Sequence, residues 1–96
     1  MNTTGPWHAT LKVANLDHRI YAETGERIAE VCNGGDMPRD ESTANALLIA
    51  AAPALLNACK NLIAALNEPD EALRRSWLID AHNKAGAAIT KAEKPQ

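Results

Sequence analysis

The sequence predicts an α+β fold, in which a three-stranded antiparallel β-meander precedes an alanine-rich helical hairpin. Three observations favour this fold. Apolar and polar residues alternate in the first third of the chain, as they do in strands with one buried face. In the second half, apolar residues recur every three or four positions, which is the spacing of helices with one buried face. Turn-forming residues concentrate in a linker over residues 33–39, which separates the two parts.

The strands are expected within residues 7–32. From Trp7 to Val13 every second residue is apolar and the residues between them are polar, which predicts the first strand. The second and third strands are expected over His18–Ala22 and Arg27–Cys32. Between them Gly25 stands where a hairpin loop requires a positive φ angle. Short turns between short strands predict an antiparallel meander.

The helices are expected over residues 41–67 and 69–93. Asp40 is expected to cap the first helix, because an N-cap carboxylate accepts a hydrogen bond from a first-turn amide. Pro53 predicts a kink or a break, because proline lacks an amide hydrogen and its ring crowds the preceding turn. The start of a new helical segment would tolerate it. Pro69 and the carboxylates after it predict that the chain reverses before the second helix.

Each helix carries an apolar stripe that is expected to face a core. In the first helix the stripe consists of Leu55, Leu56, Cys59, Leu62, Ile63 and Leu66. In the second it consists of Leu73, Trp77, Leu78, Ala81, Ala85, Ala88, Ile89 and Ala92. Trp77 is therefore expected in the core. The alanines allow close approach of a neighbouring helix, either in this chain or in a second copy.

Length and composition limit the classes of protein to consider. The chain has 96 residues, 46% of them hydrophobic and 23% charged, which indicates a single domain over residues 1–96. A net charge of −2 gives no overall attraction to nucleic acid, so no DNA partner is expected. The two cysteines and the absence of a secretory pattern predict a cytosolic protein. The longest apolar run, over residues 46–56, is about half the ~20 residues of a membrane span.

The sequence contains no recognisable motif for catalysis or metal binding. The histidines and cysteines lie in separate elements and lack the short spacing of zinc ligands. The serines and cysteines lack a nucleophile motif, and the paired acids at residues 40–41 and 70–71 stand where helix starts favour negative charge. We therefore expect a non-enzymatic protein without a metal or other cofactor.

One surface has the composition of a ligand site. Lys12, Arg19 and Arg27 lie on three neighbouring strands, and a shared solvent face would place them beside His8 and Tyr21. Such a basic and aromatic surface suits an anionic, stacking ligand such as a nucleotide. A solvated polar sheet face is the alternative interpretation. Trp7, at the start of the first strand, either closes the core or stands at its rim. The candidate ligand-binding residues are Trp7, His8, Lys12, Arg19, Tyr21 and Arg27.

Three segments carry a family resemblance. They are Thr4-Gly5-Pro6-Trp7, the hairpin segment over residues 20–31, and the segment over residues 44–58 with its run Leu48-Ile49-Ala50-Ala51-Ala52-Pro53. In these segments the chain resembles a large group of small phage and prophage proteins, over residues 4 to about 66. The resemblance implies a non-structural accessory product that acts in the cytoplasm of a bacterial host. It brings no catalytic residues with it.

Two functional hypotheses follow. In the first, the protein counters host defence by sequestering a small anionic nucleotide signal, in a pocket that an oligomer completes. In the second, it is an interaction module that binds and inhibits a host or phage protein through the helical hairpin or a sheet edge. Ile79 lies opposite the predicted stripe, and its exposure would favour the second hypothesis. The small core also favours self-association, with a dimer as the expected state.

Overall fold

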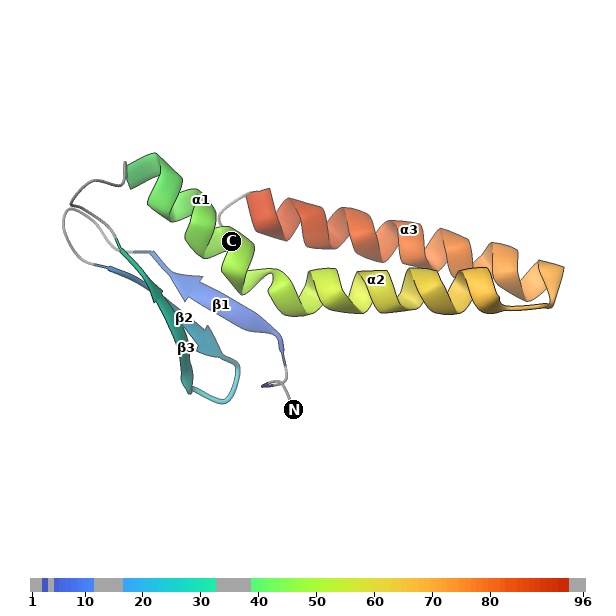
Figure 1. The fold of residues 1–96 in the computed structure, drawn as a ribbon, viewed down its shortest axis with the longest axis horizontal. Coiled ribbons are helices and arrows are strands. Elements are labelled where there is room, and N and C mark those ends of the chain that lie inside the picture. Colours follow the sequence, from blue (N-terminus) through green and yellow to red (C-terminus); the bar gives the residue numbers. More distant parts are fainter. Residues whose placement is uncertain (1–2, 4, 12–16, 33–38, 94–96) are drawn as a thin grey trace.

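A computed structural model describes residues 3, 5–11, 17–32 and 39–93. Three strands come first, β1 (Trp7–Thr10), β2 (His18–Ala22) and β3 (Arg27–Val31). Three helices follow, α1 (Arg39–Ala50), α2 (Ala52–Asn67) and α3 (Glu71–Glu93). The sheet is antiparallel in the order β1-β2-β3, so the predicted α+β fold is confirmed (Figure 1).

The predicted hairpin between β2 and β3 is present. Gly25 has a φ angle of 102°, and its amide donates a hydrogen bond of 2.9 Å to the Ala22 carbonyl. A side chain at this φ angle would be strained, which explains the glycine. β1 is shorter than predicted, because it ends at Thr10, and residues 12 and 13 of the expected strand lie outside the described part of the chain.

The inner face of the sheet packs against α1. Ile20 and Val31 from the sheet and Ala46 and Ala50 from α1 form a buried cluster. The alternation of the strands also turns Trp7 and Ala9 towards it, and a bulge in β3 adds both Ile28 and Ala29. His18 is fully buried as well, and its Nε2 lies 3.1 Å from the Thr43 hydroxyl of α1.

The proline break is confirmed. α1 ends at Ala50, α2 begins at Ala52, and Pro53 lies in the first turn of α2, where a missing amide hydrogen costs no helical hydrogen bond. The first helix begins at Arg39, so Asp40 lies within its first turn and not ahead of it. Among the described helices none alone is long and apolar enough to span a bilayer; α1 and α2 pass such a test only together, and they are bent by 51°.

Two contacts join parts of the chain that are distant in sequence. The Cα of Gly5 lies so close to the Pro53 ring that a β-carbon at residue 5 would meet Cβ and Cγ of that proline. The Lys91 ammonium donates a hydrogen bond of 2.9 Å to the Trp7 carbonyl, across 84 residues of sequence. The start of β1 is therefore held both by the α1–α2 corner and by the end of α3.

α2 and α3 form the predicted antiparallel hairpin. The Asp70 carboxylate caps α3 by accepting a hydrogen bond of 3.1 Å from the Leu73 amide. Four alanines are buried where the two helices meet, namely Ala58, Ala65, Ala81 and Ala88. Figure 1 shows that the hairpin extends well beyond the sheet and α1, and the molecule measures 53 × 25 × 19 Å. The projecting part of the hairpin thus has no second layer.

Candidate functional site

The outer face of the sheet holds four of the six residues predicted to bind a ligand. His8 lies opposite Tyr21 across β1 and β2, and their rings stack with centroids 5.9 Å apart. Arg19 lies on β2, and the bulge in β3 places Arg27 opposite Tyr21. These four side chains share the face that points away from α1.

Glu30 reduces the positive charge of this face. Arg19 pairs with Glu30 across the strands, with Nε 3.2 Å from Oε1. Arg27 donates from Nη1 to the same oxygen at 2.8 Å. Two interactions raise the pKa of Arg19 above its ordinary value. The larger is a hydrogen bond with the Tyr21 side chain, and the next is the attraction of the Glu30 carboxylate. An anionic ligand would have to compete with a carboxylate that is already bound to both arginines.

The other two predicted residues do not join this face in the structure. Trp7 lies on the opposite face of β1, where it packs against the buried cluster. Its indole Nε1 is buried and has no hydrogen-bond partner among the described residues. Lys12 lies outside the described residues. The outer face therefore holds four of the predicted residues, His8, Arg19, Tyr21 and Arg27, and it also holds Glu30, which was not predicted.

A second surface lies on the hairpin, where one side of α2 and α3 forms an apolar groove of about 490 Å³. Small residues form its base and larger aliphatic side chains its walls. The lining residues are Leu55, Ala58, Cys59, Leu62, Leu78, Ala81, His82, Ala85 and Ile89. Of these, only His82 carries a titratable nitrogen, and none is a lysine, arginine or carboxylate. We call these nine residues the hairpin groove.

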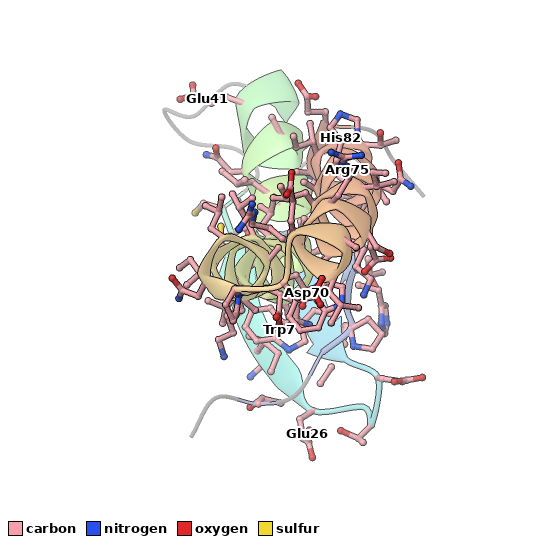
Figure 2. All side chains as sticks on the ribbon, turned by 90° about the vertical axis from the view of Figure 1, so that its right-hand side faces the viewer. Trp7, Glu26, Glu41, Asp70, Arg75 and His82 are labelled. Atoms are coloured by element: carbon pink, nitrogen blue, oxygen red, sulfur yellow. The ribbon has the colours of Figure 1, made fainter. Side chains whose placement is uncertain are left out.

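The groove opens away from the start of the sheet. Figure 2 looks along the hairpin from its tip and shows His82 on the opposite side from Trp7. On the Trp7 side, the polar residues Asn57, Asn61, Lys84 and Lys91 line a shallow depression together with four alanines. The two sides of the hairpin therefore differ in chemistry, because large aliphatic side chains line the groove, whereas amides, lysines and alanines line the other side.

The prediction that both stripes face a core was wrong for most of their large side chains. In α2, Leu62, Ile63 and Leu66 are 45%, 61% and 60% exposed, and in α3 Ile89 is 50% exposed. Trp77 and Leu73 are also exposed, at 42% and 47%. The reason is that alanines fill the seam between the helices, so the larger residues lie beside the seam with no further element to cover them.

Seven of the nine groove residues thus belonged to the predicted stripes, which were assigned to a core, and Ala58 and His82 were not predicted. The signal for an exposed face was present in α2, where apolar residues occupy more of the helix circumference than one thin neighbouring helix can cover. Ile79, for which exposure was expected, is 60% exposed. It lies beside Arg75 and His82 in a second depression along α3.

The described residues do not form a metal site. Within the described ranges no three histidine, cysteine or acidic side chains approach closely enough to hold a metal ion. Cys32 and Cys59 are both free thiols on the surface. The surfaces that the described residues form include a mixed aromatic and charged sheet face and an apolar groove.

Comparison with known proteins identifies the origin of the chain. Neither the curated proteins nor the solved structures gave a significant match. A family model described as Salmonella phage P22 protein Y8K6 matches residues 1–96. The chain therefore belongs to this family of small phage proteins.

Proposed function

We propose that this phage protein is a non-enzymatic accessory protein that acts in the host cytoplasm by binding another polypeptide through the hairpin groove. The observation that carries the proposal is a continuous apolar surface on a helical hairpin that projects beyond its own core. Helices with exposed aliphatic rows bind other helices by mutual burial of those rows. The absence of charged side chains from the groove favours such an apolar contact over recognition of a small anion.

Burial of the exposed aliphatic side chains against a partner would contribute a free energy that is large for a chain of this size. Leu62 and Ile89, which line the groove, are 45% and 50% exposed. Three further aliphatic side chains of α2 are each 43–61% exposed, namely Leu56, Ile63 and Leu66. Full burial of one such side chain contributes about 1.5–3 kcal/mol. Covering the exposed halves of Leu62 and Ile89 would therefore contribute about 2 kcal/mol, and a partner that also covered the other three would contribute about 5 kcal/mol. Small domains have total stabilities of about 5–15 kcal/mol. A covering partner would therefore change the stability of the protein substantially.

Sequestration of an anionic nucleotide is the second candidate function. The stacked His8 and Tyr21 rings beside Arg19 favour it, because a base can stack on an aromatic ring while a phosphate approaches a guanidinium. The pairing of Glu30 with both arginines weighs against it. We rank it second because binding would first require that the two ion pairs open.

The two free cysteines allow a matched test of the first proposal. Cys59 lines the hairpin groove, whereas Cys32 follows β3 at the far end of the molecule. A thiol-reactive photo-crosslinker is attached to Cys59 in the Cys32→Ser variant, and to Cys32 in the Cys59→Ser variant. Irradiation in host extract should join the Cys59 probe to a defined polypeptide, identified by mass spectrometry, and leave the Cys32 probe without that product.

The partner should then be lost when the groove changes. Introducing Leu62→Glu into the Cys59-labelled protein places a carboxylate between apolar walls and should abolish the crosslinked product. Equal crosslinking from both cysteines, or a Cys59 product that survives Leu62→Glu, would contradict a binding role for the groove.

A further inference from the structure

The shape and charge of the groove favour a particular kind of occupant. Its base consists of the small residues Ala58, Ala81 and Ala85, and its walls include Leu55, Leu62 and Leu78. Small residues along a seam let another helix backbone approach, while the walls can interlock with aliphatic side chains of that helix. A charged helix would leave its charges without partners in this groove. The fitting occupant is therefore a helix whose contacting side carries aliphatic side chains and no charge.

The chain itself contains such a helix. α2 has 16 residues, and Lys60 is its only charged side chain. Leu62, Ile63 and Leu66 project from it with about half or more of each side chain exposed. Lys60 does not line the groove, so it can stay in water when this side of α2 is covered. One molecule thus presents both the groove and a helix that fits it.

We propose that the occupant of the hairpin groove is a second copy of this chain, so that two hairpins pair about a two-fold axis into a four-helix bundle. A two-fold arrangement uses the same surface on both copies and closes without leaving an open face. This inference rests on the proposed function and names the partner of the same groove. In the pair, both sheets lie at the outside of the bundle with their outer faces accessible.

The dimensions of the hairpin suit such a pair. A helix of 16 residues is about 24 Å long and two packed helices are about 20 Å wide, so the face measures about 500 Å² in projection. The accessible area of such a face exceeds its projection, because side chains protrude from it. Stable interfaces bury about 800 Å² on each partner. No other described element of the chain can cover this face, since α1 and the sheet lie beyond its end (Figure 1).

Light scattering on the purified full-length protein over a concentration series tests the proposal. We expect a mass of twice the 10.3 kDa of the chain at high concentration, falling towards 10.3 kDa on dilution. Leu62→Glu should weaken the association by about a hundredfold or more, since its carboxylate would be buried against an apolar surface. Leu48→Glu is the matched control: it makes the same charge change at a position that is 54% exposed on α1, outside the groove, and should leave the mass unchanged.

Ile89→Lys supplies a second variant from α3, and circular dichroism of each variant shows whether the helices remain folded. A 10.3 kDa mass at every concentration, or a dimer that withstands both groove substitutions, would overturn the proposal. So would a monomer that binds neutral phospholipid vesicles through the groove. If the protein is monomeric and Cys59 still crosslinks to a different polypeptide, the partner is not a second copy of the chain, but the groove still binds a polypeptide.

Discussion

Replacement of Gly5 by alanine tests the joint between the start of the chain and the α1–α2 corner. A β-carbon at residue 5 would lie 2.9 Å from Cγ of Pro53 and closer still to its Cβ. The proline ring is rigid and lies in the first turn of α2, so it cannot rotate away as the end of a flexible side chain can. Either the first strand or the corner must therefore move.

The cost follows from the geometry. Inserting one methyl group into a packed site without room costs about 1–3 kcal/mol. For a domain of this size a loss of 1 kcal/mol lowers the melting temperature by about 4–8 °C. We therefore expect Gly5→Ala to lower the melting temperature by about 5–20 °C, and to lower the urea midpoint correspondingly.

Gly86 provides the matched control. It undergoes the same chemical change, but it lies within α3 and a β-carbon there would meet nothing within 4 Å. Alanine in a helix is favoured over glycine by about 0.5–1 kcal/mol, so Gly86→Ala should stabilise the protein. Thermal and urea unfolding, followed by circular dichroism, measure both variants.

A double-mutant cycle tests whether contact with Pro53 causes the loss of stability in Gly5→Ala. Pro53→Gly removes both ring carbons that the new methyl group would meet, so Gly5→Ala should cost much less in that background. A Gly5→Ala protein as stable as the wild type would refute the reasoning, as would a cost that is unchanged when Pro53 is glycine.

Three further predictions concern single contacts. Lys91→Met keeps most of the side-chain length but removes the donor to the Trp7 carbonyl. It should lower the free energy of unfolding, measured by urea titration, by about 1–3 kcal/mol. An unchanged urea midpoint would exclude a stabilising role for this hydrogen bond. Gly25→Ala places a side chain at a φ angle of 102° and should cost about 1 kcal/mol by the same titration, although the space around it is open. Glu30→Gln releases Arg19 and Arg27, so calorimetry should detect nucleotide phosphate binding more readily in this variant than in the wild type; no binding by either protein would remove the sheet face as an anion site.

The elements of this fold could be predicted because local patterns determine them. Alternation marked the strands, Gly25 marked the hairpin loop, and Pro53 marked the break between α1 and α2. These features depend on backbone geometry within a few residues. The shortening of β1 and the start of α1 at Arg39 shifted boundaries without changing the order of the elements.

The environment of the helical stripes could not be predicted in the same way. Periodicity shows which residues share a side of a helix, but not whether another element covers that side. Trp77 followed the pattern of a core residue and is 42% exposed, because alanines were sufficient to fill the seam. The missing information was the direction in which the hairpin leaves the sheet.

The charge of the sheet face depended on details of strand register. The solvent-facing position of Arg19 followed from alternation, whereas Arg27 reaches the same face only through the bulge, and the partner that the two arginines share was not predicted. Glu30 lies opposite Arg19 in the register, and a bulge moves Arg27 one position along β3 relative to β2. One extra residue in a strand changes which side chains meet, and the alternation pattern does not reveal it.

The most direct test of the central claim, that a polypeptide covers the hairpin groove, is the alkylation rate of Cys59 relative to that of Cys32. Both thiols are exposed in a single copy, and only Cys59 lines the groove. Mass spectrometry of the wild-type protein gives both rates in one sample. If a second copy covers the groove, the ratio of the Cys59 rate to the Cys32 rate should fall as protein concentration rises, and Leu62→Glu should remove this dependence. A ratio that stays constant across the concentration range in purified protein, and that host extract leaves unchanged, would contradict the claim.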